Sequence, residues 1–260
     1  MPSGVTGRTD AARVAESRRW FRVQGHAPVE RDGVTIVATP AHPTTWDGNF
    51  VMAGPGVGPA AVFAALERFD GWRVVQVDCL TEPGVEAALA LAGFEVANTL
   101  IEMLAGTVAS PLPVPAVGLV AVGEAEWPRF AALVEADHRE GKRTGEYDPG
   151  VAAGLLEEMR ARLGTCAYWL LVEDGVDAGY GMTVACPNGL GLIEHLFTLP
   201  DRRGRGLMSA FIVAVAGRLR AAGCDAVFLD AHAGDTPKRL YARLGFEPVA
   251  LTRTWVTRAS

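Results

Sequence analysis

The sequence predicts an α/β protein of two domains, and three observations support that prediction. Strand candidates alternate with helix candidates along most of the 260 residues. A strand–helix–strand pattern occurs twice, once in each half of the chain. Residues 110–118, SPLPVPAVG, contain three prolines and are typical of a linker. We therefore expect one domain at 1–109, a linker at 110–117 and a second domain at 118–260.

The first half contains segments whose patterns are typical of helices and strands. Residues 83–93 begin with Pro83 at a favourable first helical position and close at Gly93. Residues 72–78, WRVVQVD, have the composition of a strand. The expected helices are 11–21, 60–69 and 83–93, and the expected strands are 33–39, 49–53, 72–78 and 94–104.

The second half continues the alternation and contains one clear hairpin signal. Asp174-Gly175 lies between two apolar runs within 165–186, and an Asp-Gly pair in that position favours a tight turn between two strands. The other expected strands are 119–122, 192–199, 224–231 and 246–257, and the expected helices are 124–138, 149–163, 207–223 and 236–245.

The two strand–helix–strand segments match at corresponding positions. Asp78 and Asp230 each end a strand, and a Gly-Phe-Glu triplet follows each of them at the same interval, at 93–95 and 245–247. A duplicated βαβ unit explains this match, although strand–helix–strand is also a common local arrangement. We therefore predict an internal repeat.

Composition and charge exclude several classes of function. With 49% hydrophobic and 21% charged residues, the chain resembles globular proteins that bury a core. A net charge of −6 and a pI of about 5.4 argue against a general nucleic-acid-binding protein. No apolar run has the length of a membrane span, and the N-terminus lacks the apolar core of a secretion signal.

The cysteines and histidines predict neither disulfides nor a metal site. The four cysteines lie far apart without a CxxC motif, and the five histidines are scattered. Free thiols are typical of the reducing cytoplasm, where we expect this protein to reside.

An arginine- and glycine-rich loop separates a strand from a helix within Leu192–Ser209, LIEHLFTLPDRRGRGLMS. Gly204 and Gly206 allow the backbone to approach a ligand closely. The start of the helix offers free N–H groups and the positive end of its dipole, and the arginines add cationic donors. The loop indicates a site for a phosphate-bearing anion, although a solvated basic turn would have the same composition.

The two copies of the repeat differ in the residues that can perform chemistry. The second copy has Tyr241 where the first has Leu89, and the first half has no arginine between Phe50 and Arg68. We therefore expect any activity to belong to the C-terminal half.

Taken together, these segments resemble the GNAT superfamily of acetyl-CoA-dependent N-acetyltransferases over about residues 118–256. EHLFTLPDRRGRGL, with Arg203-Gly204-Arg205-Gly206-Leu207-Met208, resembles the acyl-CoA motif Gln/Arg-x-x-Gly-x-Gly/Ala, and RLYARLGFEPV resembles the motif after the fifth strand. Met208 departs from the small residue that is usual there. The resemblance implies a tandem of two GNAT-like α/β domains with mixed sheets. The first is a degenerate copy without a cofactor site.

The resemblance also assigns contacts with acetyl-CoA, the expected acyl donor. A splayed strand would pair with the pantetheine arm through its backbone, as in strand addition, and the loop amides would hold the pyrophosphate. Asp235 stands near the position of a family asparagine. The expected cofactor-binding residues are Leu196, Phe197, Thr198, Arg203, Gly204, Arg205, Gly206, Leu207, Met208, Ser209 and Asp235.

Tyr241 and Glu194 are the candidates for proton transfer. A phenol near the thioester sulfur can protonate the departing thiolate, so Tyr241 is the expected general acid; packing on an amphipathic helix is the alternative. Glu194 is the expected base, with Asp230 as the alternative, and a structural salt bridge explains either carboxylate equally well. On a regular strand Glu194 would share a face with Leu196 and Thr198, whereas a bulge would change that parity.

The expected function is transfer of acetyl from acetyl-CoA to an amine of a small molecule or peptide, by direct attack in a ternary complex without a metal. The alternative is a catalytically weak or inactive CoA-binding regulatory module. The expected partners are acetyl-CoA and the amine, with no nucleic acid or membrane, in a monomer or homodimer. A dinucleotide-dependent oxidoreductase is excluded, because no GxGxxG follows the first strand of a βαβ unit. Residues that can shape the acceptor pocket are His138, Glu146 and Tyr147, with Trp46, Asp47 and Asn49 either reaching the cleft or capping it.

Overall fold

The structure, a computed structural model, describes residues 6–140 and 148–258. Its chain divides into two compact units. Unit 1 consists of Met1–Glu102, Ala231–Asp235 and Pro248–Ser260, and unit 2 consists of Met103–Asp230 and Thr236–Glu247. The chain passes between the units within three strands, so neither unit is a continuous stretch of sequence. The predicted domains at 1–109 and 118–260 stay a prediction.

Unit 1 is a mixed sheet with helices. Its strand order is β1-β2-β3-β4-β11-β5. β3 and β4 pair in parallel, whereas β1 with β2, β2 with β3 and β4 with β11 pair antiparallel. The helices are α1 (Thr6–Arg22), α2 (Pro59–Leu66) and α3 (Pro83–Leu91), and the strands are β1 (Val29–Arg31), β2 (Val34–Ala38), β3 (Asn49–Ala53), β4 (Trp72–Val77), β5 (Glu95–Ala105) and β11 (Glu247–Arg258).

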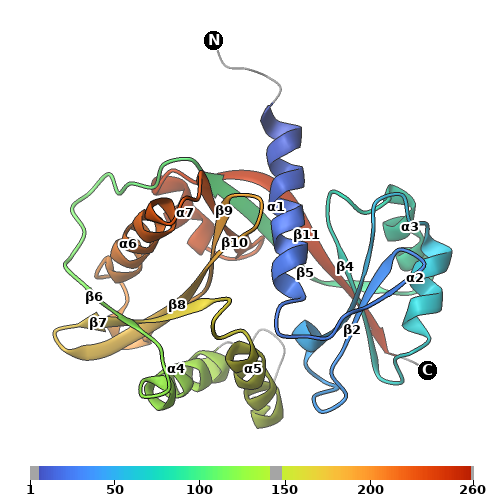
Figure 1. The fold of residues 1–260 in the computed structure, drawn as a ribbon, viewed down its shortest axis with the longest axis horizontal. Helices are drawn as coiled ribbons and strands as arrows, with labels where there is room; N and C mark the ends of the chain where they lie inside the picture. Colours follow the sequence, from blue (N-terminus) through green and yellow to red (C-terminus); the bar gives the residue numbers. More distant parts are fainter. Residues whose placement is uncertain (1–5, 141–147, 259–260) are drawn as a thin grey trace. The chain divides into compact units, whose positions relative to one another are not determined.

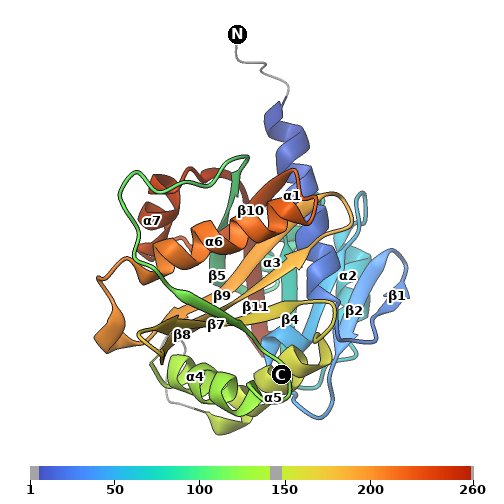
Figure 2. The same ribbon diagram turned by 60° about the vertical axis from the view of Figure 1, so that its left-hand side comes forward.

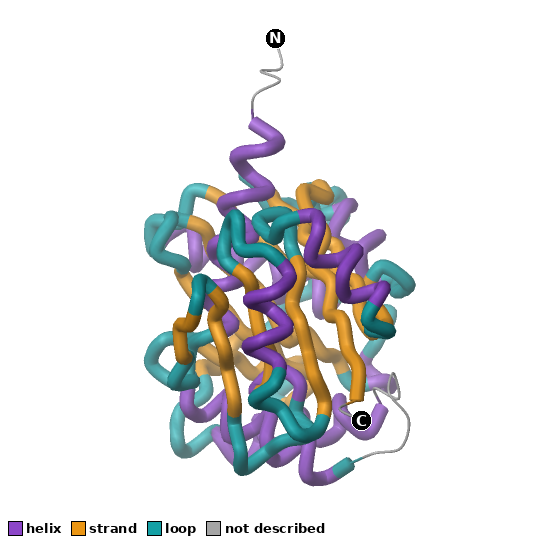
Figure 3. Tube along the Cα trace, turned by 90° about the vertical axis from the view of Figure 1, so that its right-hand side faces the viewer, coloured by secondary structure: helices purple, strands orange, loops and turns teal. Residues whose placement is uncertain are grey.

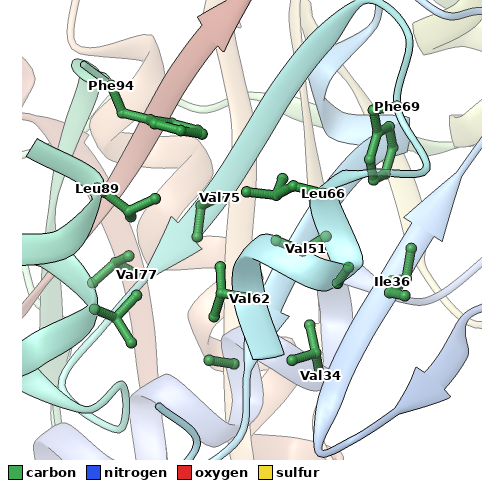
Figure 4. Packing of buried hydrophobic residues seen from close by; sticks show 13 residues of the cluster. Val34, Ile36, Val51, Val62, Leu66, Phe69, Val75, Val77, Leu89 and Phe94 are labelled. Atoms are coloured by element: carbon green, nitrogen blue, oxygen red, sulfur yellow. The ribbon is translucent and has the colours of Figure 1, made fainter. Parts of the chain in front are cut away.

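Both faces of the unit 1 sheet are buried because its strands alternate between two apolar clusters. On β3, Val51 belongs to the cluster beneath α2 and α3, whereas Phe50 and Met52 belong to the cluster on the opposite face. Figure 3 shows helices lying in front of the strands of this unit. Figure 4 shows Val62 and Leu66 of α2 pointing onto Val51 and its neighbours.

In unit 2 the strands follow the order β10-β9-β8-β7-β6. β10 and β9 pair in parallel, and the remaining neighbours pair antiparallel. In Figures 1 and 2, α6 lies on one face of these strands and α4 on the other. The helices are α4 (Trp127–Glu140), α5 (Pro149–Ala161), α6 (Leu207–Ala221) and α7 (Pro237–Arg243), and the strands are β6 (Gly118–Ala121), β7 (Ala167–Glu173), β8 (Val176–Ala185), β9 (Leu190–Thr198) and β10 (Ala226–His232).

Asp-Gly turns close two hairpins, of which the sequence interpretation recognised one. Between β7 and β8, Asp174 and Gly175 have φ angles of 51° and 78°, as the predicted tight turn requires. Asp32 and Gly33 have φ angles of 50° and 77° and close the hairpin of β1 and β2. β1 was not expected, although the same Asp-Gly signal precedes β2.

The predicted repeat has matching backbone geometry in its two copies. The amide of Phe94 donates to the carbonyl of Leu89 at 3.0 Å, and the amide of Phe246 donates to the carbonyl of Tyr241 at 3.1 Å. The intervening glycine has positive φ in both cases, so α3 and α7 end in the same left-handed capping turn. None of the helices in the described ranges is both long enough and apolar enough to cross a lipid bilayer.

Candidate active site

Strand β9 contains a bulge at the centre of the candidate site. Met182 of β8 lies opposite Glu194 and Tyr180 lies opposite Phe197, so one β8 residue faces two residues of β9. His195 has a φ of +55°, an unusual value for a residue other than glycine. The bulge therefore shifts the alternation of side chains along β9 by one residue.

The bulge overturns the face sharing expected for a regular strand. Leu196 lies on the α6 face, because a Cβ built on Gly181 would meet its Cδ2 atom at 2.9 Å and the Phe211 ring of α6 at 2.6 Å. Glu194 instead shares the opposite face with Phe197, whose ring packs 5.8 Å from that of Tyr180. The structure thus has the bulged form of the strand, in which Glu194 and Leu196 lie on opposite faces.

Beyond the bulge, the edge of β9 that faces β10 is open. The parallel register of the two strands covers only Leu190–Leu192 of β9 against 226–228 of β10. Within the described part of unit 2, no β10 residue is in register with Leu196, Phe197 or Thr198. The two strands therefore diverge where the sequence predicts a splayed strand.

The loop after β9 presents a run of backbone amides. Pro200–Arg202 forms a 3-10 turn, and Gly204 and Gly206 then adopt φ angles of +76° and +78°. At the start of α6, the amide of Ala210 donates a hydrogen bond to the carbonyl of Gly206 at 3.0 Å. Across the described residues, no acceptor is paired with the amides of 204–209. These amides and the positive end of the helix dipole make an anion-binding surface.

The arginines of the loop are paired with carboxylates. Arg203 holds both oxygens of Glu140, at 2.5 and 2.7 Å, and its Nε donates to the carbonyl of Thr198 at 2.9 Å. Arg202 and Arg205 both donate to Oε2 of Glu173, at 3.0 and 3.2 Å. These ion pairs fix the loop, and the backbone amides rather than the guanidinium groups are its uncommitted donors.

A cavity of about 460 Å³ adjoins the loop, within the usual range for ligand pockets. Its lining includes seven of the expected cofactor-binding residues, and the remaining lining comes from Arg202, a proline-rich segment and the end of α7. The expected residues in its lining are Thr198, Arg203, Gly204, Gly206, Leu207, Met208 and Ser209. Arg202, one of the arginines of the predicted anion-binding loop, also lines the cavity, and the lining that the sequence interpretation missed is Ser110–Val114, Leu240, Arg243 and Leu244. The prolines of residues 110–117 led us to interpret this segment as a linker. No feature of the sequence indicates that it lines a cavity with the loop.

Tyr241 is buried on α7 and is not part of the cavity lining. Its ring packs edge-on against Phe246, with the ring centroids 6.3 Å apart. Leu240 and Leu244, its neighbours on the helix, do line the cavity. Tyr241 is thus next in sequence to a residue that lines the cavity but does not line it itself. Its role as a general acid stays a prediction.

Glu194 is half-buried on the α4 face, beside the buried side chains of Arg162, Cys166 and Tyr168. Burial raises the pKa of the Cys166 thiol from 9.0 to about 12; the charge of Arg162 opposes this rise and that of Glu194 adds to it. Burial also raises the pKa of Tyr168 well above its usual value, and Cys166 and Glu194 add to the effect. The Tyr168 hydroxyl is buried without a hydrogen-bond partner among the described residues.

Among the other candidates of unit 2 that the structure describes, Asp230 and His138 are not part of the cavity lining. Asp235 belongs to unit 1, where its amide donates to the carbonyl of His232 at 3.0 Å. Asp230 ends the unit 2 part of β10, and His138 lies near the end of α4. Glu146 and Tyr147 fall outside the described residues.

The first-half candidates have structural roles within unit 1. The amide group of Asn49 donates to the carbonyls of His42 and Thr45, both at 2.8 Å, and its oxygen accepts from the amide of Thr39 at 3.0 Å. Trp46 packs edge-on against Trp72 at 5.3 Å. Asp47 lies 3.6 Å from Arg22. Within the described residues, no group of three or more His, Cys, Asp or Glu side chains is arranged to hold a metal.

Comparison with known proteins finds one family model that matches the loop-bearing segment. Residues 127–246 match the model described as the acetyltransferase (GNAT) family. The match covers less than half of the chain and includes the loop, α6 and α7. A search of curated proteins finds no match to the chain.

Solved structures extend the likeness over both halves of the chain. A GCN5-related N-acetyltransferase from Kribbella flavida has a TM-score of 0.69 at 20% identity, covering 96% of this chain and 96% of that chain. A conserved protein of unknown function from Staphylococcus epidermidis has a TM-score of 0.68 at 13% identity, covering 90% and 95%. A tandem GNAT protein from the clavulanic acid biosynthesis pathway has a TM-score of 0.54 at 17% identity, covering 78% and 68%. The predicted α/β GNAT fold is confirmed.

Proposed function

We propose that the protein is an N-acetyltransferase that moves acetyl from acetyl-CoA to an amine of a small molecule or peptide. The observation that supports this most strongly is the run of unbonded amides at 204–209, which opens onto the cavity at the start of α6. A GNAT domain makes acyl transfer the expected chemistry. The amides fit a pyrophosphate, because a dianion there would satisfy donors that otherwise have no protein partner.

The residues that would hold the donor form a continuous path in unit 2. The amides of 204–209 would bind the pyrophosphate, and Gly206 leaves room for close approach. The open edge of β9 at Leu196, Phe197 and Thr198 would pair with the amide groups of the pantetheine arm. Arg203, tied to Glu140, would keep the loop in position rather than neutralise the phosphates.

The proposed reaction needs one proton acceptor and one proton donor. The amine nitrogen forms a bond to the thioester carbonyl carbon, and the carbon–sulfur bond breaks. Glu194, directly or through water, takes the proton that the attacking ammonium loses. The nitrogen of the tetrahedral intermediate loses its second proton to water, and Tyr241 gives its phenolic proton to the departing thiolate and regains one from solvent. The products are an amide and free CoA, with no metal taking part.

The proposal includes a degenerate N-terminal half and a cytoplasmic location. The first copy of the repeat has Leu89 in place of Tyr241 and lacks the arginine- and glycine-rich loop, so it would hold no cofactor. Cys79, Cys166, Cys186 and Cys224 are free, as is usual in a reducing compartment.

Calorimetric titration of the purified protein with acetyl-CoA tests the proposal. We expect saturable binding, followed by amine-dependent CoA release with a panel of small amines and peptides. Absence of binding at high micromolar acetyl-CoA would contradict it. Binding without turnover on the panel would favour the alternative, a CoA-binding regulatory module, which is supported by the absence of Tyr241 from the cavity lining.

A further inference from the structure

Arg243 differs from the other arginines at the cavity. The loop arginines are committed to Glu140 or Glu173. Arg243, the last residue of α7, lines the cavity with an exposed side chain. In the ranges 6–140 and 148–258, no carboxylate lies within ion-pair distance of its guanidinium group. Arg243 is therefore the cavity cation that remains free to pair with an anionic ligand.

A second wall of the cavity is an apolar strap, Ser110–Val114. The Ser110 hydroxyl donates to the carbonyl of Leu112 at 2.7 Å and accepts its amide at 3.3 Å, which fixes the turn. The Leu112 side chain is 73% exposed, unusually high for a leucine. The strap thus offers a preformed apolar surface rather than a flexible chain.

The strap is anchored to both of the other walls. On one side, the amide of Ala109 donates to the carbonyl of Leu244 at the end of α7, at 3.2 Å. On the other, Pro115 lies 3.3 Å from the position that a Cβ of Gly206 would occupy. In Figures 1 and 2 this segment runs beside α7 and α6 on its way to β6. Strap, loop and α7 therefore enclose one cavity.

In an acyl-CoA bound at the loop, the pantetheine arm and the nucleoside lie on opposite sides of the pyrophosphate. With the pyrophosphate on the loop amides and the pantetheine arm along β9, the nucleoside is the part that still needs a binding surface. The walls not yet assigned are Arg243 with Leu240 on α7 and the strap. One is cationic and one is apolar, which matches a phosphorylated sugar beside a purine ring.

We propose that Arg243 binds the ribose 3′-phosphate of the acyl donor and that Leu112 and the strap prolines cover its adenine, so that the protein selects 3′-phosphorylated donors. The inference rests on the proposed function. A phosphate monoester has about 1.5–2 negative charges at neutral pH and accepts two parallel hydrogen bonds from a guanidinium group. Because Arg243 is exposed, its contribution falls as ionic strength rises.

Calorimetry with two donors tests the phosphate contact. The titrants are acetyl-CoA and 3′-dephospho-acetyl-CoA, and the proteins are the wild type, Arg243→Gln and Arg239→Gln. Arg239 is a matched control, since it is exposed on α7 one turn earlier and does not line the cavity. We expect the wild type to bind acetyl-CoA about tenfold more tightly than the dephospho form, as one charged hydrogen-bonded pair provides.

The variants separate this contact from general electrostatics. Arg243→Gln is expected to weaken the binding of acetyl-CoA about tenfold and to leave the affinity for the dephospho donor unchanged. Arg239→Gln should change neither affinity by more than about twofold. Equal affinities of the wild type for the two donors, or equal losses for both donors in Arg243→Gln, would overturn the inference while leaving the proposed function intact. Binding of neither donor by the wild type would overturn the proposed function and the inference with it.

The strap is tested by Leu112→Ser, with Leu91→Ser as the control. Leu91 is 91% exposed on α3 of unit 1 and is not among the residues that line the cavity. We expect Leu112→Ser to weaken both donors by the same factor, about three- to tenfold, because the adenine is common to both. Unchanged affinity in Leu112→Ser would overturn the assignment of the strap.

Discussion

Met182 of β8 lies directly opposite Glu194 of β9, whereas Tyr180, two residues earlier, lies opposite Phe197. The β9 bulge at His195 produces this pairing and places the Glu194 side chain on the sheet face covered by α4. On the same strand, the backbone beyond the bulge faces an open edge. The bulge thus directs the side chain of the candidate base toward the α4 face, two residues before the backbone segment that is the candidate edge for the pantetheine arm.

Glu194→Gln is expected to lower kcat/KM by about 10²–10⁴-fold at neutral pH, because the ammonium of the amine loses its proton acceptor. The calorimetric affinity for acetyl-CoA should stay the same. Asp230→Asn tests the alternative base. A loss of kcat/KM of this size in Asp230→Asn, with near wild-type kcat/KM in Glu194→Gln, would reverse the assignment.

Tyr241→Phe is expected to lower kcat by about 10²–10⁴-fold with acetyl-CoA affinity unchanged, because the phenolic proton is needed only when the thiolate departs. Rapid CoA release assays and calorimetry measure the two quantities. Tyr180→Phe is the control; it removes a 2.7 Å hydrogen bond to Asp137 and should reduce stability by about 1 kcal/mol without this loss of kcat. Full activity of Tyr241→Phe would show that the residue only packs against Phe246.

Gly206→Ala is expected to reduce both stability and donor affinity. A φ of +78° costs a residue with a Cβ roughly 1–2 kcal/mol, and the new methyl would press on Pro115. Displacing one amide from the pyrophosphate should weaken acetyl-CoA by about tenfold or more.

Gly217→Ala is the matched control on the same helix. It lies within α6, and a Cβ there would meet no atom within 4 Å. We expect it to stabilise the fold by about 0.5–1 kcal/mol with unchanged affinity. Wild-type affinity in Gly206→Ala would argue against the loop as the anion site.

Folding stability is expected to fall at alkaline pH partly because of Cys166. Its pKa is raised from 9.0 to about 12, so the unfolded chain releases the thiol proton at a lower pH than the folded chain. The stability due to the neutral thiol is complete below pH 9 and is lost as the pH rises toward 12, at up to about 1.4 kcal/mol per pH unit.

Urea unfolding at a series of pH values measures this loss. In Cys166→Ala, the free energy of unfolding should fall less steeply above pH 9 than in the wild type. The cavity left by the substitution lowers stability by the same amount at every pH and does not change this slope. Cys79→Ala, which removes an exposed thiol of unit 1, should change the slope less. Parallel declines in the wild type and Cys166→Ala would contradict the prediction.

Local signals in the sequence located most secondary structure and the loop. The Asp174-Gly175 pair predicted a tight turn, because its positive φ angles are energetically unfavourable for most other residues. Gly204 and Gly206 marked a loop that needs left-handed backbone, and the triplets at 93–95 and 245–247 marked matching helix ends. Each of these features depends on the conformational limits of a few neighbouring residues, which the sequence states directly.

Only the tertiary structure decided which side chains meet. It placed the bulge at His195, paired Arg203 with Glu140 across 63 residues of sequence, and brought the 110–114 strap against the loop. It also assigned β11 to unit 1, where residues 253–258 pair with β4. Such relationships arise from packing between segments distant in the chain, where register, burial and charge pairing are settled together. Local pattern therefore determined the elements and the anion-binding loop of this protein, whereas the faces, walls and free cation of its candidate site followed from the fold.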